Sequence, residues 1–114
     1  MNWKDSFKEG TELILSTSSK DGSPNANIVI SLGFMDNKIL IANCQMKTTI
    51  NNLKENPRIC VISKYYRIRG SVEIFSSGKY FELCKKKNKK YNVNNAILLT
   101  VKDVFDLDKG SKIE

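Results

Sequence analysis

Apolar and polar residues alternate in several short stretches of the chain, which is the pattern of β-strands with one buried face. The first three stretches, residues 11–18, 26–34 and 39–42, are separated by short segments rich in Asp, Asn, Gly and Pro. Segments of that composition form tight turns. The spacing therefore predicts that the first three strands follow one another as an antiparallel meander.

Three further strands are predicted, over residues 58–63, 65–75 and 96–105. The strand 65–75 alternates most regularly, with even-numbered residues on one face and odd-numbered residues, including Arg67 and Arg69, on the other. Gly70 within it predicts a bulge or a close approach by another group. The last strand is expected to share one face among Ile97, Leu99, Val101 and Phe105. The polar tail from Asp106 is expected to fray.

Two segments repeat instead with the period of an α-helix. Residues 47–55 carry Ile50 and Leu53 on one face, and a following Asn-Pro pair ends the segment. Residues 79–90 carry a second apolar stripe, formed by Tyr80, Leu83 and Cys84. Six strands with only two short helices predict a single all-β domain, residues 1–114, built as a six-stranded antiparallel barrel with Greek-key-like connections.

The composition excludes several kinds of catalytic site. The chain has 114 residues, a formal net charge of +7 and no histidine, so Ser-His-Asp and Cys-His catalysis and imidazole metal sites are excluded. Its three cysteines, Cys44, Cys60 and Cys84, form no CxxC pair, and we expect neither a bound metal nor a disulfide framework. No apolar stretch has the length of a signal peptide or a membrane span, so we expect a cytoplasmic protein without a membrane partner.

The passage from the strand 39–42 into the helix 47–55 is the strongest candidate for a binding site. The first turn of a helix offers unpaired N–H groups and the positive end of the helix dipole. Lys47 adds a full charge, and Thr48 and Thr49 add hydroxyl donors, so this corner predicts a phosphate cradle. The same residues also fit a simpler interpretation, in which a threonine caps the helix and Lys47 is a solvated charge.

The order of several segments resembles the FMN-binding split barrel of the pyridoxamine 5'-phosphate oxidase-like family, and the length is closest to its small single-domain flavoproteins. The similar segments lie at residues 21–25, 27–31, 39–43, 46–48, 51–58 and 68–73, and together they span residues 11–107. The resemblance implies an all-β split β-barrel with short helices. It also implies a homodimer that holds noncovalent FMN at the subunit interface.

The resemblance further implies a set of cofactor-binding residues. Lys47 and Thr48 match the phosphate-binding positions, and Asn51 follows one turn later, within reach of the ribityl chain or the phosphate. Two strand segments flank the cofactor, Asn27, Ile28 and Val29 in the first and Ile41, Ala42 and Asn43 in the second. Val29 and Ile41 are apolar and would supply a wall for the flavin ring.

A flavin site of this kind predicts an oxidoreductase that acts on an unknown small substrate, with FMN carrying the chemistry. Arg69 is our candidate for a cation that stabilises the negative charge of the reduced flavin or meets an anionic substrate. No side chain stands out as an acid-base catalyst. We do not expect pyridoxal phosphate synthesis, because the C-terminal Arg and His contacts of the larger oxidases have no matching positions here.

Other functions also fit the sequence. A barrel of this kind can hold flavin without turnover, as a storage, sensing or electron-transfer protein, and the resemblance leaves open a deazaflavin or haem in place of FMN. The +7 charge and the basic-aromatic strand around Arg67 and Arg69 fit a domain that binds single-stranded nucleic acid. We favour the flavin site over nucleic acid, and we interpret the five lysines within residues 85–90 as a solvated helix end.

Overall fold

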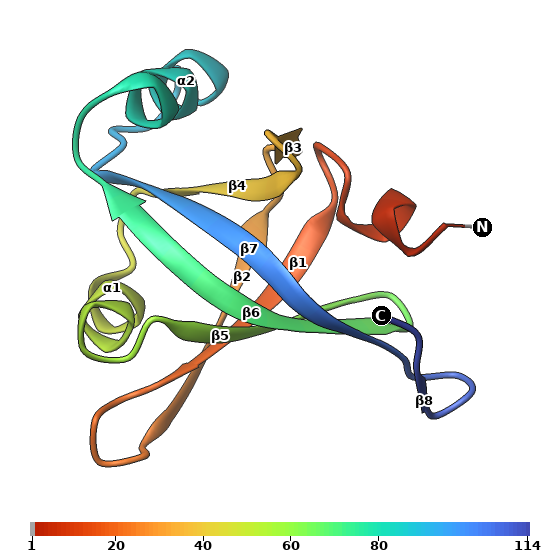
Figure 1. Ribbon diagram of the computed structural model, residues 1–114. Helices are drawn as coiled ribbons and strands as arrows, with labels where there is room; N and C mark the ends of the chain where they lie inside the picture. Colours follow the sequence, from red (N-terminus) through yellow and green to blue (C-terminus); the bar gives the residue numbers. More distant parts are fainter. Residues whose placement is uncertain (1) are drawn as a thin grey trace.

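The computed structural model describes residues 2–114, in which the strands form one antiparallel sheet (Figure 1). The strands are β1 (Glu12–Ser18), β2 (Pro24–Ile30), β3 (Phe34–Met35), β4 (Lys38–Asn43), β5 (Arg58–Ser63), β6 (Tyr66–Phe75), β7 (Asn95–Asp106) and β8 (Ser111–Lys112). Their order in the sheet is β2-β1-β5-β6-β7-β4-β3, with β8 paired to β7. The helices are α1 (Lys47–Glu55), α2 (Lys79–Lys87) and the short 3-10 helix η1 (Trp3–Phe7).

The sheet curls without closing, and its two ends are joined by the chain itself. Residues 31–33 carry the chain from β2 at one end of the sheet to β3 and β4 at the other. Across this join the Leu32 N–H donates to the carbonyl of Leu40, and the Leu40 N–H donates to the carbonyl of Gly33, both at 2.9 Å. The predicted all-β class with short helices and an antiparallel, split barrel-like sheet is confirmed. The predicted strand 26–34 is wrong in its second half, because β2 ends at Ile30 and Phe34 belongs to the two-residue strand β3. The predicted meander is also wrong, since β4 pairs with β7 and not with β2. Strand β8 was not predicted.

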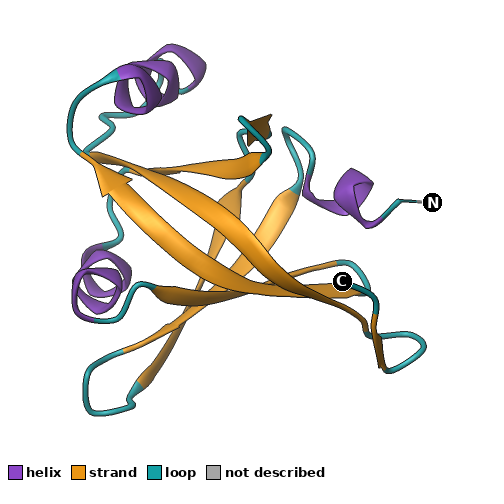
Figure 2. Ribbon diagram, viewed as in Figure 1, coloured by secondary structure: helices purple, strands orange, loops and turns teal. Residues whose placement is uncertain are grey.

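Strand β4 and the first half of β7 are buried on both faces, which explains their nearly continuous apolar sequences. Their odd-numbered residues, Ile39, Ile41, Ile97 and Leu99, join the main core between the strands, η1 and α1. Their even-numbered residues, including Leu40, Ala96 and Leu98, pack instead under α2 around the buried Cys84. The helices therefore lie outside the curved sheet, each over a different part of it (Figure 2).

A β-bulge between β6 and β7 changes which face of the sheet the last residues of β7 occupy. Arg69 pairs with Asp103 but Gly70 pairs with Val101, so Lys102 is an extra residue in β7. The extra residue reverses the alternation beyond it, and Val104 enters the core while Phe105 moves to the outer face, which makes the expected placement of Phe105 wrong. Both effects predicted for Gly70 occur, because a Cβ at this position would lie 2.0 Å from the carbonyl oxygen of Thr100.

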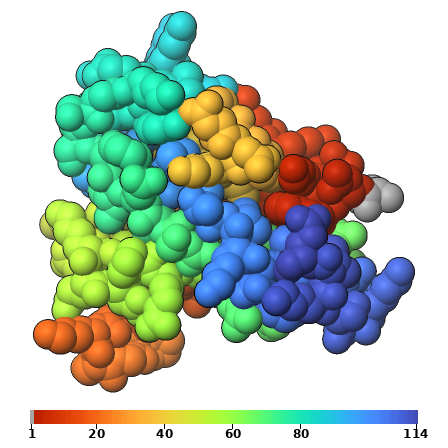
Figure 3. Space-filling view, in the orientation of Figure 1, coloured from red at the N-terminus to blue at the C-terminus, as the bar shows by residue number. Residues whose placement is uncertain are grey.

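The two ends of the chain pack together, contrary to the expected fraying of the tail (Figure 3). Trp3 and Phe7 of η1 are buried in the main core. The indole N–H of Trp3 donates to the carboxylate of Glu114 at 2.8 Å, and the Ile113 N–H donates to the carbonyl of Val104 at 2.8 Å. The tail is held because these bonds and the short strand β8 tie it to β7 and η1.

Candidate functional site

The loop between β4 and α1 is fixed by the side chain of Asn43, which is 3% exposed. Its amide nitrogen donates to the side-chain oxygen of Asn95 at 2.9 Å, and its amide oxygen accepts the Met46 N–H at 2.8 Å. On the far side of the loop, the side chain of Asn94 donates to the carbonyl of Cys44 at 2.8 Å. Asparagines of β4 and of the approach to β7 thus set where α1 begins.

A cavity of about 450 Å³ opens beside this loop. Its lining residues are Asn43, Cys44, Gln45, Met46, Lys47, Ile50, Asn94 and Asn95. None of these eight residues is acidic, and amide groups dominate the polar lining. The volume lies within the range of small-molecule sites, which is roughly 300–1,000 Å³.

The first turn of α1 supplies this cavity with positive charge. Met46 is the N-cap residue and its side chain makes no capping hydrogen bond, so the first N–H groups of the helix keep no side-chain partner. Lys47 and Thr48 are exposed, and in residues 2–114 Lys47 takes part in no ion pair. The Lys47 N–H donates to the carbonyl of Gln45 at 3.1 Å, so the amides that follow it are the ones open to a ligand. These amides, the Lys47 ammonium and the helix dipole together favour an anion here.

The threonine cap that we considered as the simpler interpretation does not form. The buried hydroxyl of Thr49 donates to the side-chain oxygen of Asn27 and accepts from the side-chain amide of Asn25 at 3.0 Å. These bonds attach α1 to β2 and leave the helix start uncapped. Asn27 therefore lies beside α1, on the side of the helix that faces β2.

The remaining cofactor candidates lie on different faces of their strands or helix, some buried and some exposed. Val29 shares the inward face of β2 with Asn27 and packs against the core, whereas Ile28 points to the other face and is 65% exposed. Ile41 has no exposed surface, so its side chain cannot serve as the expected wall for a ring in this conformation. Ala42 faces the cluster under α2, and Asn51 is exposed on α1.

Arg69 belongs to a different part of the surface. Its guanidinium bonds to the carboxylate of Asp103 at 3.2 Å and lies 4.9 Å from the centre of the Phe105 ring. Arg69 lines a second cavity of about 720 Å³ on the outer face of the sheet, which shares no lining residue with the Lys47 cavity. Within one chain, the structure therefore does not bring Arg69 to the phosphate candidate.

The outer face of β1 and β2 carries an apolar patch made of Ile14, Ile28 and Ile30. These side chains are 46%, 65% and 50% exposed, and Ile14 is the direct cross-strand partner of Ile28. Ile62 of β5 lies next to Ile14 on the same face. Clusters of exposed isoleucines are typical of surfaces that bind another molecule. Our inference from the sequence did not identify this patch, although the unbroken apolar run 28–30 was a signal for it.

The thiols show no sign of activation. Burial raises the pKa of Cys44 and Cys60, and it raises the pKa of Cys84 to about 11, so all three remain protonated near neutral pH. All three are free cysteines. Among residues 2–114 no group of three or more Cys, Asp or Glu side chains is arranged to hold a metal ion. No helix in the same range is long and apolar enough to cross a membrane.

Fold and site together define a split-barrel protein with a positively charged corner where β4 leads into α1. The family model described as pyridoxamine 5'-phosphate oxidase matches residues 3–107. The chain therefore belongs to the pyridoxamine 5'-phosphate oxidase family.

Solved structures share this fold at low sequence identity. HupZ from Group A Streptococcus superposes with a TM-score of 0.84 at 21% identity, covering 97% of this chain and 95% of that one. An FMN-binding protein from Syntrophomonas wolfei subsp. wolfei gives a TM-score of 0.70 at 18% identity, covering 90% and 79%. An F420 reductase gives 0.72 at 17% identity, covering 93% and 98%.

Proposed function

We propose that this chain binds FMN noncovalently and works as an oxidoreductase, passing electrons between a reductant such as a nicotinamide nucleotide and a small organic acceptor. The observation that carries the proposal is the uncapped start of α1, where Lys47, with no ion-pair partner among residues 2–114, borders a cavity without an acidic lining residue. Membership of the family and the likeness to an FMN-binding protein support the same cofactor. The free cysteines favour a reducing compartment, and we place the protein in the cytoplasm.

The residues present fit the chemical groups of FMN. The ammonium of Lys47, the hydroxyl of Thr48 and the amides that follow Lys47 in the first turn of α1 would hold the phosphate. Asn51, exposed one turn further along α1, would meet the ribityl chain. FMN itself supplies hydride and single-electron chemistry when bound, and this chain would supply position and charge.

The partner that we propose is a second copy of the chain, packed on the apolar patch of β1 and β2. A stable interface buries roughly 800 Å² on each partner, and an exposed isoleucine cluster is suited to its centre. Arg67 and Arg69 lie on the same outer face, since Cys60 pairs with both Ser16 of β1 and Arg69 of β6. In such a dimer, the partner's outer face would supply an apolar wall for the flavin ring and a second cation in addition to Lys47.

A pair of substitutions at the helix start tests the cofactor site. Lys47→Ala combined with Thr48→Ala should weaken FMN binding by a factor of about a hundred or more, because two charge-assisted bonds are lost and each contributes roughly 1.5–3 kcal/mol. Flavin fluorescence titration measures the affinity. Lys54→Ala is the matched control, because it removes the same charge from the last turn of the same helix.

An unchanged affinity in the double variant would remove the phosphate assignment. A deazaflavin such as F420 also carries a phosphate, so titration with F420 in parallel identifies which ring the site accepts. If the purified protein binds neither flavin but binds single-stranded oligonucleotides with an affinity that falls steeply with salt concentration, the nucleic-acid function is favoured instead. Flavin binding without any reductase or oxidase turnover would favour a storage or electron-transfer role.

A further inference from the structure

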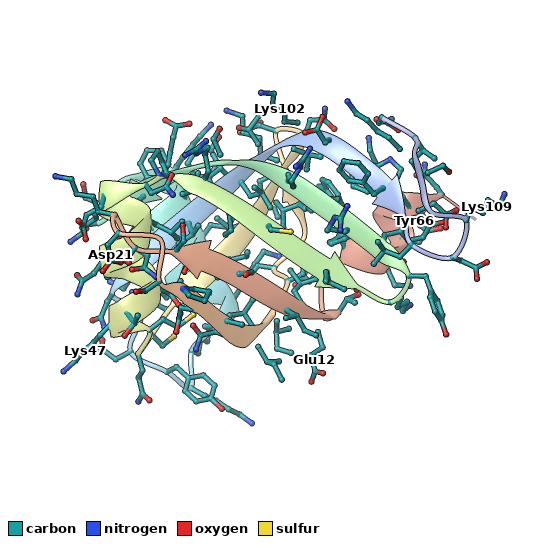
Figure 4. All side chains as sticks on the ribbon, turned by 90° about the horizontal axis from the view of Figure 1, so that it is seen from below. Glu12, Asp21, Lys47, Tyr66, Lys102 and Lys109 are labelled. Atoms are coloured by element: carbon teal, nitrogen blue, oxygen red, sulfur yellow. The ribbon has the colours of Figure 1, made fainter. Side chains whose placement is uncertain are left out.

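The larger cavity, about 720 Å³, lies on the outer face of the sheet, away from the Lys47 corner. Its floor is the middle of β5 and β6 with the β-bulge of β7, and its rim includes the ends of β1 and β2 and the Asn56 turn. Sheet pairing places Ser16, Cys60, Arg69 and Asp103 side by side in one row across four strands. In the next row Arg58 stands opposite Ser71. Figure 4 shows Asp21 of the β1–β2 hairpin and Lys47 of α1 at one end of the molecule, with Tyr66 and Lys109 at the other.

The charge in this cavity is positive and only partly balanced. Arg58, Arg69 and Lys102 line it, and Asp103 is the single acidic residue in the lining. The carboxylate of Asp103 already forms two ion pairs, with Arg69 at 3.2 Å and with Lys112 at 3.0 Å. Over residues 2–114, neither Arg58 nor Lys102 has a carboxylate partner. Two cations therefore remain available to an incoming anion.

The guanidinium of Arg58 is held in place by a chain of hydrogen bonds. The hydroxyl of Ser18 accepts from the side-chain amide of Asn56 at 3.2 Å, and the amide oxygen of Asn56 accepts from Nε of Arg58 at 3.1 Å. These hydrogen bonds use only Nε of Arg58. Its two terminal nitrogens have no partner within residues 2–114 and can bind an oxyanion in bidentate geometry. Orienting the donor beforehand lowers the entropic cost of binding.

The β-bulge contributes a second preformed element. The extra residue that it inserts is Lys102, which lies on the rim of the cavity beside Gly70. Since Gly70 contacts the carbonyl of Thr100 where any side chain would collide, the bulge is a fixed feature of the floor. Ser16, Ser18 and Ser71 add hydroxyl donors among these cations. Guanidinium, ammonium and hydroxyl donors around one polar cavity are the groups that recognise phosphate and carboxylate.

We propose that this cavity is a binding site for a small organic oxyanion, a phosphate ester or a carboxylate, with Arg58 and Lys102 as its principal contacts and Asn56 as a positioning residue. The site is separate from the flavin phosphate site, and it stands whether or not the chain binds FMN.

Solution NMR of the whole chain tests the proposal with inorganic phosphate and citrate as separate probes. Saturable amide shifts are expected at residues 16–18, 56, 58–60, 69–71 and 102–103. The probe that binds more tightly identifies the class of ligand. Arg58→Gln and, independently, the surface variant Lys102→Gln should each weaken binding about tenfold or more, since each removes a charge-assisted contact. Asn56→Ala should weaken binding less, because it removes only the hydrogen bond that orients the Arg58 guanidinium.

Two controls make the outcome specific. Lys86→Gln removes an exposed charge from α2, and Lys47→Ala with Thr48→Ala disables the flavin corner; both should leave this binding unchanged. The proposal is overturned if neither probe gives a saturable shift, if the shifts are confined to the start of α1, or if the Arg58 and Lys102 variants bind as tightly as the parent. Tight binding of oligonucleotides with only weak, unsaturated shifts from both small anions would also overturn it.

Discussion

At the scale of single residues, Gly70 carries the clearest constraint in the sheet. Its missing side chain lets β6 approach the carbonyl of Thr100, and a Cβ there would lie 2.0 Å from that oxygen. Backbone atoms cannot move aside as a flexible side chain can. The register of β6 and β7 beyond this point depends on that contact, and so does the outward placement of Phe105.

Gly70→Ala should therefore destabilise the fold by at least about 1–3 kcal/mol, the usual cost of overpacking a rigid site. Chemical denaturation followed by tryptophan fluorescence measures the difference, since Trp3 is the single tryptophan and is buried. Ser71→Ala, at the exposed neighbouring position, is the matched control and should be nearly neutral. Equal stabilities of the two variants would contradict the close approach.

The carboxylate of Asp103 connects one residue to the pH dependence of stability. Hydrogen bonding and charge from Lys112, followed by Arg69, hold the pKa of Asp103 below its ordinary value of 3.8. Because the pKa is depressed in the folded state, the contribution of this group to stability is present above pH 3.8. It is lost as the pH falls through the lower folded-state pKa.

Asp103→Asn should accordingly lower the free energy of unfolding at pH 7 and have less effect at a pH below the folded-state pKa. Urea denaturation of parent and variant at both pH values provides the comparison. A loss of stability that is the same at both would show that the carboxylate charge is not what matters. The variant also frees Arg69, so it reports on the floor of the larger cavity.

At the scale of elements, the apolar patch on β1 and β2 lies on a part of the sheet that no helix of residues 2–114 covers. Helix α2 covers β4 and β7, and α1 and η1 pack against the main core, but Ile14, Ile28 and Ile30 have no helix above them. Ile28→Glu should therefore prevent dimer formation and, if the cofactor lies at the interface, release FMN as well. Sedimentation velocity and flavin fluorescence of the same samples measure the two effects.

Lys20→Glu, at the exposed turn between β1 and β2, is the control for adding negative charge near the patch. A monomeric parent, or a dimeric Ile28→Glu variant, would contradict the proposed interface. A monomeric variant that keeps full FMN affinity would separate the dimer from the cofactor site.

Elements with a clear period could be predicted from the sequence. The bounds of α1 and β5 match the predicted residues 47–55 and 58–63, because a proline and regular burial mark them. Helix α2 ends at Lys87 instead of near residue 90. The short helix η1 has too few residues for a period to show. Its stability comes from burying Trp3 and Phe7 against strands that are distant in sequence.

The candidate site was predictable only in part, for a related reason. The corner at Lys47 could be found because strand, loop and helix are contiguous in the chain. The larger cavity gathers residues from β1, β5, β6 and β7, and the bulge that sets its floor shifts the alternation of β7. Local patterns do not contain that information. Ile41 illustrates the converse: its position fits the family, but burial on both faces of β4 removes its side chain from the surface.

At the scale of the whole molecule, the curved sheet separates two charged regions. Lys47 and the start of α1 lie in one cavity, and Arg58, Arg69 and Lys102 lie in another, with no lining residue in common. Part of the net charge of +7 is therefore carried by basic residues that line these two cavities. A dimer through the β1–β2 patch would bring these regions of two chains into one assembly, with FMN between them.

The central claim is that the start of α1 holds the phosphate of a flavin. Titrating the purified chain with FMN, followed by flavin fluorescence and visible absorption, tests it most directly. We expect saturation at one FMN per chain, with a perturbed flavin spectrum and competition by free phosphate at high concentration. A fluorescence signal that stays that of free FMN at every protein concentration would contradict the account.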